Sequence, residues 1–130
     1  MILRILPLLA VLNACEQPDE TVTAYATHDG VYQLSTLDGV PFPAQATIDL
    51  RVTGTVSGQA PCNTYRTAQT APYPWFTLGP IVATRRACPD LDAETRYLTA
   101  LATMTIVEAA NDLLILSNEA GESMVFQASP

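Results

Sequence analysis

The sequence predicts an α+β domain with about seven or eight mostly antiparallel strands, in a curled sheet or incomplete barrel with one helix packed on it. Short extended runs, separated by turn pairs such as Asp38-Gly39 and Gly79-Pro80, recur along most of the chain. Only residues 89–104 carry apolar side chains at helical spacing. Because a half-apolar sheet and a single amphipathic helix bury their apolar faces against each other, these observations predict the packed arrangement.

The first predicted strand covers residues 31–37. Residues 48–52 alternate apolar and polar side chains, which is typical of a half-buried strand, and the alternation resumes after Gly54 at residues 55–57. These two segments predict a hairpin. Gly58, at its end, is expected to be a bulge or a point at which another backbone segment approaches closely.

Shorter elements are expected in the second half. Pro72 and Pro74 exclude a central strand from the proline-rich segment that contains them. After the helix, the β-branched residues 105–107 favour a strand. Residues 113–116 and 124–126 follow as a pair of strands joined by a turn.

The predicted helix begins at residues 89–92 and ends near residues 102–104. Asp90 or Asp92 is expected to cap its free amides, and Glu94 suits the positive end of the helix. The face expected to cover the sheet carries the larger apolar side chains of the segment: Leu91, Tyr97, Leu98, Leu101, Ala102 and Met104.

Residues 1–14 are predicted to be a lipoprotein signal peptide. Their apolar run, residues 5–12, is far shorter than the about 20 apolar residues that cross a bilayer. Residues 12–15, Leu-Asn-Ala-Cys, resemble the bacterial lipobox, in which the cysteine is lipidated after cleavage. We therefore predict lipidation of Cys15; the alternative is an unmodified cysteine near an ordinary secretory cleavage site.

Residues 15–28 are predicted to be the lipid anchor and a polar tether, and residues 29–130 the folded domain. The tether is polar and acidic without an apolar period, and twelve such residues extend to about 40 Å. The expected location is the bacterial cell envelope, with the domain facing the periplasm. Glu16 is not the aspartate that often marks retention in the inner membrane, so the outer membrane is the predicted site.

Composition excludes several classes of partner and cofactor. A formal net charge of −7 repels nucleic acid and anionic lipid headgroups. His28 is the single histidine, so neither a Ser-His-Asp triad nor an imidazole-ligated transition-metal site is expected. Asp90, Asp92 and Glu94 alternate like the acids of a calcium loop, but the glycine and the later glutamate of such a loop are missing. We expect no metal, no cofactor and no enzymatic activity.

A series of short motifs spans residues 31–128: Tyr32-Gln33-Leu34, Leu37-Asp38-Gly39, Val56-Ser57-Gly58, Cys62-Asn63, Thr84-Arg85-Arg86-Ala87-Cys88, and Glu94 with Tyr97-Leu98 and Leu101. Their order and spacing resemble the META domain, the HslJ-like family of small bacterial lipoproteins. The chain departs from the family pattern in three places: Tyr32 stands where Trp is usual, Pro61 where Gly is usual, and Tyr65-Arg66 where the family tends to carry an aromatic residue and Gly after Asn63. The resemblance implies a role at the cell envelope, linked to heat stress and drug tolerance, and it implies no catalytic residues.

A disulfide between Cys62 and Cys88 is predicted. Lipidation of Cys15 leaves these two cysteines, and export delivers them to an oxidising compartment in which disulfides persist. The bridge would join the region after the residue 55–57 strand to the start of the helix. The alternative is a pair of buried free thiols packed as small apolar groups.

Four side chains form the predicted interaction surface: Tyr73, Trp75, Arg85 and Arg86. The aromatic pair can instead pack over the open end of the sheet, and the arginines can lie on a solvated face or in an internal ion pair. The expected function is that of a non-enzymatic, stress-related lipoprotein that acts through contacts with an envelope protein. The alternative is a binder of a small apolar ligand in the mouth of a partial barrel, which requires an apolar cavity lined by the helix.

Overall fold

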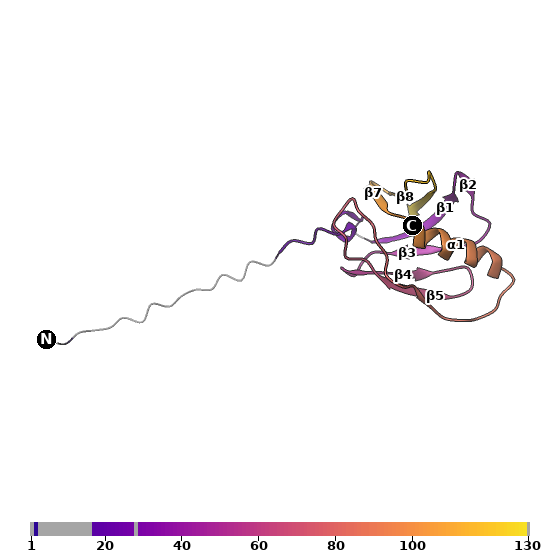
Figure 1. Ribbon diagram of the computed structural model, residues 1–130, viewed down its shortest axis with the longest axis horizontal. Coiled ribbons are helices and arrows are strands. Elements are labelled where there is room, and N and C mark those ends of the chain that lie inside the picture. The colour runs from indigo at the N-terminus through magenta and orange to yellow at the C-terminus, as the bar shows by residue number, and fades with distance from the viewer. Residues whose placement is uncertain (1, 3–16, 28, 130) are drawn as a thin grey trace.

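The computed structural model describes residues 2, 17–27 and 29–129 of the chain. The described residues form nine strands, one α-helix and one short 3-10 helix (Figure 1). In chain order the elements are η1 (Val22–Tyr25), β1 (Val31–Leu37), β2 (Val40–Pro41), β3 (Thr47–Asp49), β4 (Thr55–Gln59), β5 (Thr64–Ala68), β6 (Val82–Ala83), α1 (Leu91–Thr103), β7 (Ile106–Ala110), β8 (Leu113–Ser117) and β9 (Ser123–Ala128).

The strands form one sheet in the order β6-β5-β4-β3-β1-β9-β8-β7, with β2 paired to β1 alone. Every pairing is antiparallel. Because β6 and β7 do not pair with each other, the sheet is open and curled rather than a closed barrel. The predicted α+β class, with a curled sheet and one helix packed on it, is confirmed.

β3 and β5 differ from the prediction, each for a local reason, and the short strand β2 was not predicted either. β3 ends at Asp49, and Val52 lies 63% exposed before the Gly54 turn instead of continuing the strand. β5 was not predicted, because its inward positions are only partly apolar. Tyr65 and Thr67 are both buried, and the Thr67 hydroxyl donates to the carbonyl oxygen of Gly79 at 2.8 Å.

The segment between β5 and β6 is held by a buried amide, that of Gln69. Gln69 is 2% exposed; its Oε1 accepts from the backbone N–H groups of Ala71 and Thr77, and its Nε2 donates to the Ala71 carbonyl. Isolated bridges join Gln69 to Leu78 and Trp75 to Ile106 of β7. The segment therefore runs from the end of β5 across to the opposite edge strand of the sheet.

The predicted polar tether is shorter than residues 15–28, since its second half packs on the domain. Val22, in η1, is 1% exposed and belongs to the core. Asp19 Oδ1 accepts from the N–H and hydroxyl of Thr21, and its Oδ2 accepts from the Thr53 hydroxyl at 3.0 Å. A single buried valine in a polar stretch has no period, so the sequence pattern could not reveal this packing.

Helix α1 has the predicted position but a different buried face. Its buried residues are Ala93, Glu94, Tyr97, Ala100 and Leu101. Leu91 is 44% exposed and Ala102 is exposed, so the predicted apolar face was wrong in those two positions, whereas Leu98 is partly buried and packs against the core. Asp90 is the N-cap residue, but its side chain makes no capping hydrogen bond, and Asp92 lies within the first turn.

These burials set the expected effect of truncating the two leucines of the helix. Leu98→Ala should lower the free energy of unfolding by less than about 2 kcal/mol, because that side chain is only partly buried at the edge of the core. Leu101→Ala, at a fully buried position, should lower it by about 2–5 kcal/mol. Urea unfolding of both variants tests the packing; a larger loss for Leu98→Ala would contradict it.

Candidate functional site

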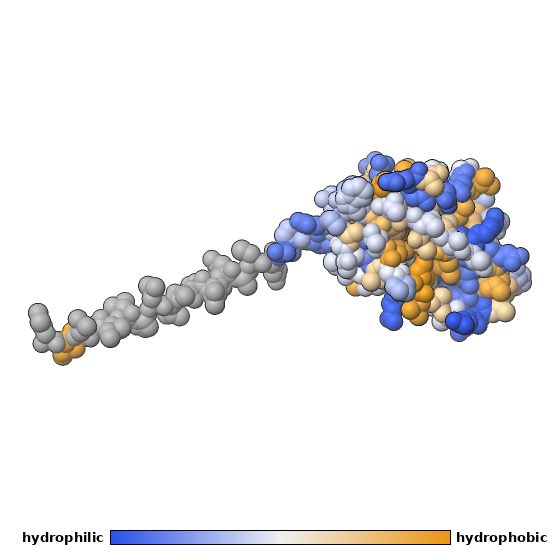
Figure 2. Space-filling model, in the orientation of Figure 1, coloured by the Kyte–Doolittle hydropathy of each residue, from blue (hydrophilic) through white to orange (hydrophobic). Residues whose placement is uncertain are grey.

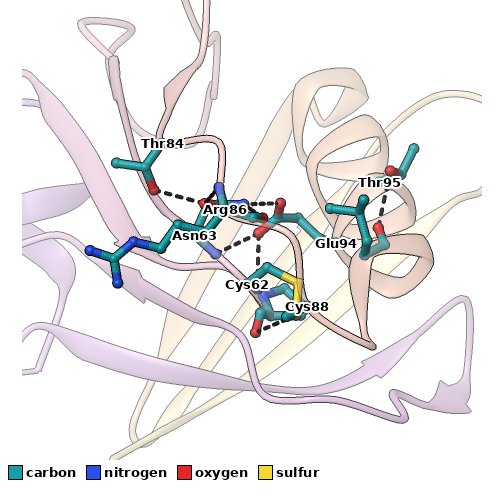
Figure 3. The surroundings of a disulfide bond; sticks show 9 residues. Cys62, Asn63, Thr84, Arg86, Cys88, Glu94 and Thr95 are labelled. Carbon is teal, nitrogen blue, oxygen red and sulfur yellow. Dashed lines mark hydrogen bonds between the residues drawn. A yellow bond between two sulfur atoms is a disulfide. The ribbon is translucent and has the colours of Figure 1, made fainter.

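A buried carboxylate and a buried amide join the helix to two loops of the sheet. Glu94, 5% exposed in α1, accepts hydrogen bonds at Oε1 from the backbone N–H groups of Cys62 and Asn63, at 3.0 and 2.7 Å. Its Oε2 accepts from Asn63 Nδ2 at 2.6 Å (Figure 3). Three donors thus replace water around a charge that would be costly to bury alone.

Asn63 extends the same network to the segment before the helix. Its Oδ1 accepts from the Thr84 hydroxyl at 2.9 Å and from the backbone N–H of Arg86, while its Nδ2 also donates to the Arg86 carbonyl. The Arg86 side chain extends away from the Glu94 carboxylate (Figure 3). The arginine is therefore held by its backbone, and its charge does not neutralise Glu94.

The predicted disulfide is present beside this network. Cys62 and Cys88 are bridged, with their Cα atoms 5.6 Å apart. The disulfide links Cys62 to Cys88, which lies three positions before α1. Glu94, in the first turn of that helix, accepts a hydrogen bond from the backbone N–H of the same Cys62. Three of the motifs that carry the family resemblance, Cys62-Asn63, Thr84 to Cys88 and Glu94, thus meet at the start of the helix, where the Glu94 carboxylate and the Asn63 amide are both hydrogen-bonded.

A second buried polar cluster lies under the helix. The hydroxyls of Tyr65 and Tyr97 are 2.7 Å apart, and both lie within hydrogen-bond distance of the Thr47 carbonyl oxygen, at 2.7 and 3.1 Å. Since each phenol has one proton, one donates to the carbonyl and the other to its neighbour. Burial raises the pKa of both tyrosines above the usual value of 10.0, so both stay protonated and neutral.

Gly58 provides the space for this tyrosine cluster. A Cβ at position 58 would lie 2.1 Å from the Thr47 carbonyl oxygen and 3.0 Å from the Tyr65 hydroxyl. Of the two predicted roles for this glycine, the close approach of another backbone segment is the one confirmed.

The predicted interaction surface is not one surface. Tyr73 stacks on Tyr25 with ring centroids 4.0 Å apart. Trp75, two residues after Tyr73, is 57% exposed. Arg85 and Arg86 are exposed beyond the start of β5, where the Thr84 N–H donates to the Thr64 carbonyl. The two pairs flank opposite ends of β5, which are separated by about 14–17 Å for five residues.

An open groove of about 640 Å³ crosses the face of the sheet turned away from α1. Outward side chains of β3, β4 and β5 line it, including Asp49, Ser57 and Arg66, with Val82 at the β6 edge. Asp49 is bonded to Arg51, with 2.7 Å between Oδ2 and the guanidinium, and these bonds lower the pKa of its carboxyl. Arg66 has no ion pair with any residue that the structure describes.

Arg66 and Val82 also line a second, adjacent groove of about 290 Å³. The two hollows therefore share Arg66, which has no ion pair with the described residues. The sequence did not reveal this surface, because β5 was not predicted. On the side of the domain seen in Figure 2, hydrophilic and hydrophobic residues are interspersed.

Three further predictions concern lipidation, metal binding and membrane spanning. Cys15 and His28 lie outside the described residues. Within the described part of the chain, no group of three His, Cys, Asp or Glu residues is arranged to hold a metal ion. No helix among those residues has the length and apolar character needed to cross a membrane.

Comparison with solved structures finds three similar chains, two of which come from stated organisms. A protein from Burkholderia xenovorans, determined by NMR, is 27% identical, with a TM-score of 0.64 over 88% of this chain and 92% of the other. A DUF4847 family protein from Bacteroides vulgatus, determined by crystallography, is 12% identical, with a TM-score of 0.64 over 78% of this chain and 93% of the other. The second similarity concerns the fold alone.

At the level of sequence, no curated protein matches the chain. The model of the META domain matches residues 25–130, which include every strand, helix α1, the disulfide and the Asn63–Glu94 network. The chain belongs to the META domain family.

Proposed function

We propose that this META domain protein is a non-enzymatic lipoprotein of the bacterial cell envelope that acts by binding another protein. The observation that carries the proposal is the contrast between a filled interior and an open outer face. Buried side chains occupy the space between helix and sheet, whereas the groove around Arg66 is open to solvent. Arginine is enriched at protein interfaces because it combines charge with a planar, weakly hydrated surface.

The interior argues against the alternative of a small apolar ligand held beneath the helix. Tyr97 is fully buried, with its ring centroid 5.7 Å from that of Tyr65 and 6.4 Å from that of Phe126. Neither of the two grooves described above is lined by residues of α1. A ligand beneath the helix would have to displace this aromatic packing, so the apolar-ligand function loses its structural support.

The cellular part of the proposal is lipid attachment at Cys15, followed by presentation of the domain to the periplasm at the outer membrane. Its support is the lipobox resemblance of residues 12–15 and the family's association with stress at the cell envelope. The surface available for a partner is the Arg66 groove, where an acidic side chain of that partner would pair with the guanidinium.

Proximity labelling in intact cells tests both parts at once. The lipidated wild type should label a specific set of envelope proteins, and Arg66→Glu should lose at least one of them because it reverses the charge in the groove. Arg96→Glu makes the same charge change on the exposed side of α1 and is the matched control.

Lipid attachment is measured separately by fractionation and by mass spectrometry of the N-terminus. Cys15→Ser should release the protein from the membrane fraction, and the wild type should carry an acylated cysteine. Equal partitioning of the two proteins would refute the anchor. An unchanged labelling pattern for Arg66→Glu would refute the groove as the binding surface.

A further inference from the structure

Among the described residues, the chain makes its first contacts with the domain at Asp19, four residues after the proposed anchor at Cys15. Asp19 is tied to Thr21 and Thr53, and the Glu20 carbonyl accepts from the Tyr73 N–H at 2.7 Å. Four residue steps separate Cys15 from Asp19, and even when fully extended they span only about 14 Å. A lipid on Cys15 would therefore hold this end of the domain against the bilayer rather than about 40 Å away, the reach of a twelve-residue tether.

The end that faces the anchor carries aromatic and apolar side chains in water. We name it the N-terminal face and define it as Tyr25, Val52, Tyr73 and Trp75. Tyr25, Val52 and Trp75 are 54%, 63% and 57% exposed. The contacts of Glu20 and Tyr25 with Tyr73 place both tyrosines beside the chain that leads to the anchor. Val52 precedes Thr53, which is bonded to Asp19, and Trp75 follows Tyr73 by two residues.

Tyrosine and tryptophan are the side chains that prefer the headgroup level of a bilayer, because each combines an apolar ring with one polar group. In Figure 1 residues 17–27 join the domain at one end, and the segment that leads into α1 passes along the other end. Arg85, Arg86 and the disulfide belong to that far segment. A bilayer at the N-terminal face would thus leave the arginines in the aqueous compartment.

We infer that the N-terminal face lies on the lipid headgroup layer of the membrane that holds the Cys15 lipid, and that this contact fixes the orientation of the domain. The inference rests on the proposed anchor. Asp19 and Glu20 border the face and the net charge is −7, so the suitable surface is zwitterionic rather than anionic. The contact is apolar and interfacial, and salt should change it little.

Trp75 is the only tryptophan of the chain, so its fluorescence reports this face alone. The lipidated full-length mature protein is placed in phosphatidylcholine vesicles in which part of the lipid carries bromine near the headgroup end of its acyl chains. Bromine quenches tryptophan at short range. We expect Trp75 to lose a large part of its emission, with the same loss at low and high salt.

A matched control moves the reporter to the far end of the domain. Trp75→Phe combined with Leu91→Trp places the only tryptophan at the start of α1, where Leu91 is 44% exposed and lies three positions after Cys88. This control, lipidated to the same extent, should keep its emission. Equal quenching of the two reporters would mean that the domain has no preferred orientation and would overturn the inference.

Two further outcomes are decisive. A protein that is acylated and sediments with the vesicles, but whose Trp75 emission is unchanged, would overturn the inference while leaving the anchor intact. Absence of acylation would remove the anchor and the inference together. In cells, a photocrosslinker at position 75 should give lipid adducts, and discrete protein adducts would show that the N-terminal face binds a protein instead.

Discussion

Glu94→Ala is expected to lower the free energy of unfolding by roughly 3–6 kcal/mol, although the substitution removes no large apolar side chain. The carboxylate accepts three hydrogen bonds, two of them from the consecutive backbone N–H groups of Cys62 and Asn63. Alanine leaves those donors without their acceptor at a position that is 5% exposed. Each buried donor without a partner costs about 1–3 kcal/mol.

The same substitution should loosen the segment before the helix. Asn63 Nδ2 is oriented by Glu94, and Asn63 Oδ1 holds Thr84 and Arg86. Without Glu94 the amide keeps only its bonds to Thr84 and Arg86, and weakening of those bonds adds to the loss from the two backbone donors. Hydrogen exchange should show faster exchange of the backbone N–H groups of Cys62, Asn63 and Arg86.

Two controls separate this network from the effect of a negative charge near the helix N-terminus. Asp92→Ala removes an exposed carboxylate from the same first turn, and should cost less than about 1 kcal/mol. Glu94→Gln keeps an oxygen for the two backbone donors but places an NH₂ group against Asn63 Nδ2, and its loss should lie between the other two. Equal losses for Glu94→Ala and Asp92→Ala in urea unfolding would show that the network adds nothing.

Sequence patterns predicted the elements whose burial is governed by local apolar periodicity. β1, the hairpin around Gly54 and the position of α1 follow from alternation, turn residues and helical spacing, and all three are present. Helix α1 shows where such patterns fail. The leucines suggested one face, but the sheet accepts Glu94 and Tyr97 because Asn63, Tyr65 and Thr47 supply their hydrogen bonds.

Residues whose burial leaves no local apolar period account for most of what was missed. Glu94 is buried by partners about thirty residues away, Gln69 by backbone groups of its own loop, and Val22 is a single apolar residue in a polar stretch. The predicted interaction surface failed for the same reason: Tyr73 and Trp75 lie near one end of β5, and Arg85 and Arg86 near the other. β5 was not predicted, because its inward Thr67 interrupts the apolar alternation typical of a strand. Local spacing cannot report which loops meet at either end of such a strand.

Removal of the disulfide is the other large effect expected. Cys62→Ser combined with Cys88→Ser should lower the free energy of unfolding by roughly 3–4 kcal/mol, because the bridge closes a loop between residues 26 positions apart and restricts the unfolded chain. That is a large share of the about 5–15 kcal/mol that stabilises a typical domain. The folded structure should remain, since Glu94 still holds residue 62 to the helix.

The measurement is urea unfolding without reductant, with thiol counting on the unfolded protein. Wild type should show no reactive thiol other than Cys15 when that residue is unmodified, and a reductant should lower its midpoint to that of the double serine variant. Two additional reactive thiols in the unreduced wild type would contradict the bridge. A midpoint unaffected by the two serines would contradict its contribution to stability.

The bridge and the carboxylate act on the same joint, so their effects should not add. Both hold Cys62 to the start of α1, one through Cys88 and the other through the backbone N–H of Cys62 itself. With the bridge intact, residue 62 stays near the helix even in Glu94→Ala, and the freed N–H groups find other acceptors in part.

Without the bridge the whole segment can separate from the helix. Glu94→Ala should therefore lower the free energy of unfolding by about 0.5–3 kcal/mol more in the double serine background than in wild type. A cycle of the four proteins measures this difference, and a value of zero would mean that the two devices stabilise independent parts of the domain.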